Sequence, residues 1–216
     1  MNLTRTHLAC AFLMIVGAGA LRVIAADNKA DLSSPKSAAK SLVQSVEAGD
    51  ADGLKKIMLA EGPDQEKLAA AFSDVILSGK KLSDAARAKF GAAGEALGQA
   101  MITKEDVAKI DTAQVEEKAG TATLTISGQS KPLVFQKKDA DWRLLVMDFA
   151  GAAPDQIDKQ RALLTAFAHA LTEATEEITS GRYANASDAE AAIKQKLNNV
   201  MVKNFQPTTA PTSKPS

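Results

Sequence analysis

The sequence has a single cysteine, a single tryptophan, a single tyrosine and two histidines among its 216 residues. One cysteine excludes an internal disulfide framework and a metal site built on several thiolates. Cys10 also follows closely behind Arg5, before an apolar signal segment could form, which makes it poorly placed for lipidation. Aromatic residues are 4% of the chain and alanine is about a fifth of it. We therefore expect long helices that contact each other through small side chains.

No charge of either sign predominates, because 26 basic residues stand against 26 acidic ones. Arg5 and Arg22 lie in the first 26 residues and every acid follows them, so the remainder has 24 basic and 26 acidic residues. This balance gives no general reason to bind nucleic acid or an anionic membrane, and we expect neither as a partner. The sequence also has no glycine-rich phosphate loop, no nucleophile elbow and no internal repeat, so no motif indicates a reaction.

Residues 1–26 have the pattern of a secretory signal peptide. Arg5 lies in a short basic segment, an apolar run from Leu8 to Leu21 follows, and the small residues that end at Ala26 suit a signal peptidase. An uncleaved anchor helix is the alternative, but the run is short for a span of about 20 residues and Arg22 interrupts its far side. We predict cleavage at Ala26, a secreted or periplasmic protein, and no transmembrane segment after cleavage.

Helical signals dominate the chain after a polar leader at 27–33. Ser34 and Pro35 supply an N-cap and a proline at the first helical position, and Gly49-Asp50 ends one helix and caps the next. Gly62-Pro63 separates a second helix, with Met58 on its buried side, from a third, and Ser83 is placed to cap a fourth. The predicted helices cover residues 34–48, 50–60, 63–79 and 83–101.

Three glycines, Gly91, Gly94 and Gly98, lie near one side of the predicted fourth helix. Each costs about 1 kcal/mol relative to alanine in a helix interior, which indicates that something packs close to the backbone. That neighbour is either a ligand or partner, or another element of the same chain. We favour packing within the chain, because helix contacts through small residues are common.

Beyond a short helical segment at 104–110, the apolar period becomes two. Alternating residues run from Ala113 to Ile126 with a break at Gly120, and strands follow at 133–135 and 142–147, joined by a polar turn at 138–141. One face of such a sheet must be covered, and the preceding helices are the available cover. This predicts an α+β fold with N-terminal helices on an antiparallel meander of three to four strands.

The pattern of elements in residues 34–149 resembles that of a known superfamily. The paired helices that meet at Gly49-Asp50, the later helices, and a last hairpin reading VFQKKDADWRL from Val134 to Leu144 resemble the nuclear-transport-factor-2-like superfamily, particularly its small secreted bacterial members of unassigned function. The resemblance implies a cone that is empty, binds a small molecule, or carries an isomerase or dehydratase site with a carboxylate and often a histidine. Phe90 and Trp142 are then the candidate ligand-binding residues.

The chain departs from the enzymatic members of that superfamily. His169, the only histidine after the signal peptide, lies outside the resembling region. Asp74 and Asp106 are lone acids in ordinary local surroundings, which gives no reason to expect a raised pKa. We therefore assign no catalytic residue and expect no cofactor.

Two further helices follow the breaks at Gly151 and Pro154. The first carries an apolar stripe that includes Ile157 and Ile178, and the sequence from Ser187 to Glu190 has the spacing of a capping box for the second. The second helix should turn Ile193, Leu197, Val200 and Met201 inward. We predict an antiparallel hairpin at 150–204 that covers the sheet's remaining face or presents a surface to a partner, and a disordered Pro/Thr/Ser tail at 205–216.

Two polar patterns in this hairpin have competing interpretations. His169, Glu173 and Glu176 lie near one helix face and could ligate a metal, but no second ligand cluster is evident, so we favour a solvated polar face and predict no metal site. Asn185-Ala186-Ser187 fits an N-glycosylation acceptor, which matters only in a eukaryotic host; otherwise it leads into the capping box.

These observations favour a secreted or periplasmic binding domain without catalytic activity. Its partner would be another protein or a small apolar ligand, and a homodimer is also open. One alternative is a pocket enzyme of the isomerase or hydrolase type, which requires buried acids beside Trp142 or Phe90. The other is a structural envelope component, which requires a continuous exposed apolar stripe on the final two helices.

Overall fold

The computed structural model describes residues 30–94, 97, 104–129 and 131–205. The predicted signal peptide with its cleavage at Ala26, residues 27–29 of the polar leader, Gly98 and the tail beyond Phe205 lie outside the described residues, so they stay predictions. Among the helices that the structure does describe, none is long and apolar enough to cross a membrane.

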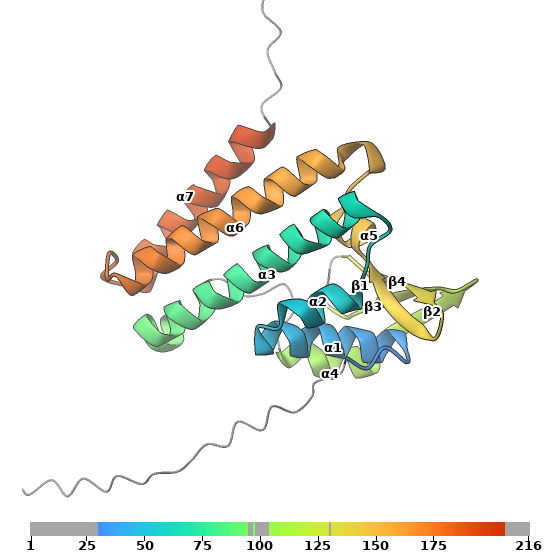
Figure 1. Ribbon diagram of the computed structural model, residues 1–216. Coiled ribbons are helices and arrows are strands. Elements are labelled where there is room, and N and C mark those ends of the chain that lie inside the picture. The colour runs from blue at the N-terminus through green and yellow to red at the C-terminus, as the bar shows by residue number, and fades with distance from the viewer. Residues whose placement is uncertain (1–29, 95–96, 98–103, 130, 206–216) are drawn as a thin grey trace, which may run out of the picture.

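The described chain has the predicted α+β fold (Figure 1). A sheet part combines a five-stranded sheet with short helices, and a layer of three long helices extends from it. In chain order the elements are α1 (Pro35–Ala48), α2 (Ala51–Ile57), β1 (Met58–Leu59), α3 (Pro63–Phe90), the 3₁₀ helix η1 (Gly91–Gly94), α4 (Lys104–Thr112), β2 (Gln114–Lys118), β3 (Thr121–Thr125), β4 (Leu133–Lys138), β5 (Asp141–Leu145), α5 (Val146–Ala150), the 3₁₀ helix η2 (Pro154–Gln156), α6 (Ile157–Thr179) and α7 (Ala186–Phe205).

The caps of the first two helices are those predicted. The Ser34 hydroxyl accepts the backbone N–H of Ser37 at 3.1 Å, and Pro35 occupies the first helical position. Gly49 ends α1 in the left-handed conformation, with φ at 68°, a region that favours glycine. The Asp50 carboxylate then accepts the backbone N–H of Gly53 at 2.8 Å and starts α2.

The predicted end of the second helix near residue 60 is wrong. α2 ends at Ile57, and Met58 and Leu59 form β1, which pairs in parallel with Leu144 and Leu145 of β5. Both residues of β1 are buried. Backbone pairing with β5 thus satisfies polar groups that a continued helix would have satisfied internally, and the tertiary contact overrides the local pattern.

The predicted break between a third and a fourth helix is also wrong. α3 runs without interruption from Pro63 to Phe90, through Gly79 and Ser83. Its contact with α6 is the most extensive between any two elements described, and that packing outweighs the roughly 1 kcal/mol that a mid-helix glycine costs. α3 ends at Phe90, with Gly91 as its C-cap, and not near residue 101; part of the predicted extension lies outside the described residues.

Packing within the chain explains why position 94 is a glycine. A Cβ at this position would lie 2.2 Å from the carbonyl oxygen of Ala86, which is backbone and cannot move aside cheaply. η1 therefore folds back against the end of α3, and only glycine fits there. This supports close packing within the chain over a ligand as the neighbour of Gly94.

The sheet has the strand order β1-β5-β4-β3-β2, with β2 to β5 forming the predicted antiparallel meander. The fifth strand, β1, was not predicted. The last strand ends at Leu145 and not at Met147, because Val146 begins the short helix α5. The buried face of the meander contributes Ala122, Leu124, Leu133, Phe135, Trp142 and Leu144 to a core that α1, α2 and α3 complete.

The C-terminal hairpin forms as predicted, but it packs beside α3. α6 lies along α3 and α7 lies on α6 (Figure 1), and neither α6 nor α7 has a substantial contact with a strand. A second core joins these helices and consists of Leu82, Ala86, Leu97, Ala174, Ile178, Ala189 and Ile193. α3 belongs to both cores, since its Leu68 and Phe72 lie in the first and its Leu82 and Ala86 in the second.

The start of α7 differs from the predicted capping box. The Asn185 side-chain oxygen accepts the backbone N–H of Asp188 at 2.9 Å, and its amide donates to the Asp188 carboxylate at 2.9 Å. The first bond is an N-cap bond, whereas the second joins the two side chains and does not return to the N-cap backbone N–H as a capping box does; both lie two residues before the Ser187 to Glu190 pair that the spacing suggested. Asn185 is therefore the N-cap, and in this fold its side chain has a structural role.

Candidate functional site on the C-terminal helices

The structure does not bring the two candidate ligand-binding residues together. The Trp142 side chain is 5% exposed in the first core; its backbone N–H donates to the Leu32 carbonyl at 2.7 Å, and the Lys137 Nζ lies 5.7 Å from its ring centroid. Phe90 instead packs against the second core. Each aromatic ring has a packing role in a different core, so they do not line one pocket.

The acids that a pocket enzyme would need are not gathered in the described part of the chain. Asp74 is exposed on α3, and the Asp106 side chain lies outside the described residues. The buried polar residues of the described chain are Ser41, Ser45 and Ser73, without a carboxylate among them. The Ser73 hydroxyl, for example, donates to the Ala69 carbonyl at 2.9 Å within α3, which is a structural bond.

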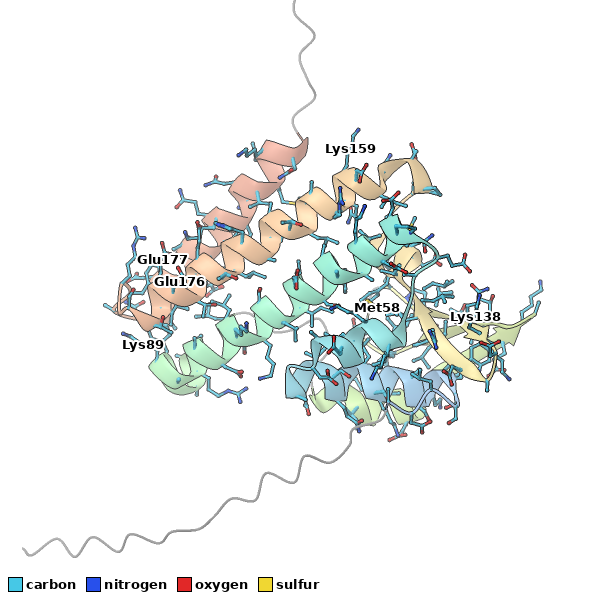
Figure 2. The ribbon with its side chains drawn as sticks, in the orientation of Figure 1. Met58, Lys89, Lys138, Lys159, Glu176 and Glu177 are labelled. Atoms are coloured by element: carbon cyan, nitrogen blue, oxygen red, sulfur yellow. The ribbon has the colours of Figure 1, made fainter. Side chains whose placement is uncertain are left out.

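A group of interacting charged side chains lies where α6 turns into α7. This group, the hairpin cluster, consists of Glu173, Glu177, Arg182, Tyr183 and Lys196. Glu177 is at its centre: its carboxylate accepts the Tyr183 hydroxyl and pairs with Arg182, and Lys196 of α7 pairs with it at 3.2 Å. Lys196 also contacts the Glu173 carboxylate at 3.3 Å. Figure 2 shows Glu176 and Glu177 at this end of α6.

The protonation of the hairpin cluster follows from its contacts. The Tyr183 hydroxyl bond, followed by Lys196 and Arg182, lowers the pKa of Glu177 against the opposing effect of burial. Burial and then the bond to Glu177 raise the pKa of Tyr183. Burial disfavours the charge on Lys196, but its bonds to Glu177 and Glu173 outweigh this and raise its pKa. These shifts favour the charged forms of Glu177 and Lys196 and the neutral form of Tyr183, as a structural clamp does.

The His169 face does not assemble a metal site in the described structure. The His169 Nδ1 lies 3.4 Å from the Glu173 carboxylate, but the His169 side chain is 74% exposed. Glu173 also contacts Lys196, an arrangement that disfavours a cation there. Across the described residues no group of three or more His, Cys, Asp or Glu side chains is arranged to hold a metal ion.

A groove of about 440 Å³ lies between α6 and α7, next to the hairpin cluster. Its apolar residues are Ala166, Ala170 and Val200. Its polar residues are His169, Glu173, Lys196, Asn199, Lys203 and Asn204. Figure 1 shows why it opens: α7 meets α6 at the hairpin loop and diverges from it toward its C-terminal end.

The α7 side of this groove differs from the prediction. Ile193 is buried as expected, but Met201, predicted to point inward, is 42% exposed, and Val202 is 57% exposed. The register of α7 is the reason, because the face that lines the groove carries Lys196, Asn199, Val200, Lys203 and Asn204, and Met201 and Val202 point away from it. The sequence held a signal for this: Val200, Met201 and Val202 are consecutive, and consecutive residues of a helix cannot all face one neighbour.

No family model, no curated protein and no solved structure matches this chain. The resemblance to the nuclear-transport-factor-2-like superfamily thus stays a prediction.

Proposed function

We propose that this protein is a secreted or periplasmic interaction domain without catalytic activity, and that it binds a protein partner at the C-terminal half of α7. We name the binding region the α6–α7 surface; it consists of Ala166, Ala170, Val200, Met201, Val202 and Lys203. The observation that carries the proposal is the exposure of Met201 and Val202. They are the large hydrophobic residues that the described chain leaves exposed, and in the sequence they lie between Val200 and Lys203, which line the groove.

The physical reason is the arrangement of apolar residues around α7. Successive residues of a helix point about 100° apart, so Val200, Met201 and Val202 point in three different directions and cannot all pack against α6. Fully burying a valine or methionine side chain contributes about 1.5–3 kcal/mol, so a partner at this surface would gain free energy that the isolated chain does not.

The extent of the apolar surface favours a local partner over a structural role along the whole hairpin. A structural envelope component requires a continuous exposed apolar stripe on both final helices. Within the described residues, the exposed large hydrophobic side chains are confined to Met201 and Val202 at one end of α7. The remainder of the hairpin buries its apolar stripe against α3.

Site-specific crosslinking in the native cell tests this proposal. A photoreactive amino acid replaces Val202 in one strain and Lys56, which is exposed on α2, in a control strain. We expect a discrete adduct at position 202 and none at 56. The captured protein is then identified by mass spectrometry, purified and titrated against the chain.

A second variant makes the test quantitative. Met201→Asp should lower the affinity of the purified pair by a factor of ten or more. Burial of the methionine side chain would contribute about 1.5–3 kcal/mol, and the variant places a charge there instead. Lys56→Glu should leave the affinity unchanged. Equal crosslinking at positions 202 and 56, or unchanged affinity of the Met201→Asp variant, would refute the proposal.

A further inference from the structure

We infer that Met201 is a site of reversible oxidation, at which a peroxide converts the thioether to a sulfoxide and thereby weakens binding of the partner at the C-terminal half of α7. This inference rests on the proposed function and adds a regulation of that interaction. It follows from the sulfur content of the chain, from the exposure of its methionines, and from the place of Met201 in the fold.

Methionine is the sulfur-containing residue that an oxidant meets in the predicted mature chain. Cys10 is the only cysteine, and it lies in the predicted signal peptide. Cysteine thiolates and methionine thioethers are the sulfur groups that oxidants attack in proteins. After cleavage at Ala26 the chain offers only thioethers, which belong to Met58, Met101, Met147 and Met201.

The fold leaves one of the methionines that it describes exposed. Met201 is 42% exposed, whereas Met58, which lies in β1 within the sheet part (Figure 2), is 3% exposed. Met147 is half-buried and packs against the first core. Met101 lies outside the described residues. Because susceptibility to oxidation follows exposure, Met201 should react before Met58 and Met147.

The reaction is a two-electron oxygen transfer from a peroxide. The Met201 sulfur attacks one oxygen of hydrogen peroxide, so that an S–O bond forms and the O–O bond breaks. The transferred oxygen gives its proton to the departing hydroxide, and the products are the sulfoxide and water. The sulfur is oxidised by two electrons and the peroxide is reduced by two. Methionine sulfoxide reductases return the side chain to the thioether, which makes the change reversible.

The sulfoxide changes the property on which the proposed interaction depends. It replaces a flexible apolar side chain with a polar one, and a polar group that is buried without a hydrogen bond opposes binding. Met201 belongs to neither of the two cores of the described chain. Oxidation at this position should therefore lower the affinity for the partner and leave the stability of the fold unchanged.

Peptide mapping of the peroxide-treated mature chain tests the site. Trypsin places each of the four methionines in a separate peptide, and these peptides are 57–67, 90–104, 144–159 and 197–203. Mass spectrometry follows the gain of one oxygen in each peptide over time in hydrogen peroxide. We expect Met201 to be oxidised about tenfold faster than Met58, with Met147 between them, in line with their exposure. In concentrated urea these three rates should converge, because the fold no longer protects Met58.

Variants of the chain assign the effect on binding to Met201. All of them carry Met101→Leu, which removes the methionine outside the described residues. Peroxide should lower the affinity of this chain for the protein captured at position 202 by about tenfold, and a methionine sulfoxide reductase should restore it. The affinity that Met201→Leu has should not respond to peroxide, whereas Met147→Leu should keep the response. Thermal melts before and after treatment should agree.

Several results would overturn the inference. Oxidation of Met58 or Met147 as fast as that of Met201 in the folded chain would show that the fold does not select the site. Faster oxidation of Met201 that persists in urea would assign the selectivity to the local sequence. An equal loss of affinity in Met201→Leu would assign the effect to another residue. A captured partner whose affinity does not respond to peroxide leaves the proposed function standing and removes the regulation, whereas selective oxidation of Met201 without a captured partner removes the proposed function and keeps the modification site.

Discussion

Tyr183→Phe should destabilise the protein through one hydrogen bond in the hairpin cluster, and the loss should depend on pH. The phenylalanine keeps the ring that packs against the second core and removes only the hydroxyl that donates to Glu177. Hydrogen bonds to charged groups contribute about 1.5–3 kcal/mol. The Glu177 side chain is 16% exposed and Arg182 and Lys196 still pair with it, so we expect a loss at or just below the lower end of that range, about 1–1.5 kcal/mol at pH 7.

The sign of the pH dependence follows from the Glu177 carboxyl. Its pKa in the folded protein is lowered from the ordinary value of 4.5. Its contribution to stability is therefore fully present above about pH 4.5 and is lost as the pH falls through the lowered pKa. Without the Tyr183 bond the Glu177 pKa rises toward its ordinary value. The difference in unfolding free energy between wild type and Tyr183→Phe should then shrink as the solution is acidified.

Urea denaturation followed by circular dichroism at pH values from 7 to 3 measures this difference. In a separate thermal melt at pH 7 the same loss should appear as a drop in Tm of roughly 2–6 °C for a domain of this size. Glu190→Gln, which breaks the exposed pair with Lys194 on α7, is a matched control and should change stability by less than about 0.5 kcal/mol. A loss for Tyr183→Phe that is the same at every pH, or no larger than that of the control, would refute the reasoning.

Three further predictions concern stability and are checked by chemical denaturation. Gly94→Ala should cost about 1–3 kcal/mol, because its Cβ would meet the Ala86 carbonyl oxygen at 2.2 Å; a neutral result would show that η1 can move. Trp142→Ala should cost about 3–5 kcal/mol, since the ring is 5% exposed, and a loss under 1 kcal/mol would contradict its place in the core. Asn185→Ala should cost about 1 kcal/mol whereas Ser187→Ala should cost under 0.5, and the reverse order would restore the capping box that the spacing suggested.

Local signals predicted the parts of the fold that depend on neighbouring residues. Ser34, Gly49 and Asp50 act through bonds to residues within five positions, so their roles could be inferred from the sequence. The alternation of the meander likewise predicted which face of β3, β4 and β5 is buried. These elements follow from backbone preferences and from periods of 2 and 3.6 residues.

Long-range contacts decided the elements that were predicted wrongly. Gly79 remains helical because α6 packs along α3, and Met58 forms a strand because β5 lies beside it; both contacts join residues that are far apart in the chain. The groove depends on the angle between α6 and α7, which no local pattern contains. Only the run from Val200 to Val202 indicated, from the sequence, that α7 would leave apolar side chains exposed beside the groove.

The continuity of α3 through both cores has a consequence for the order in which the chain can fold during synthesis. The half of α3 that carries Leu82 and Ala86 is made before the four-stranded meander, whereas its partners Ala174 and Ile178 are made after the meander. The nascent chain therefore exposes an unpaired apolar helix face while the meander forms. That face is a natural target for chaperones until α6 emerges, and folding should finish at the C-terminus, where the helical layer closes.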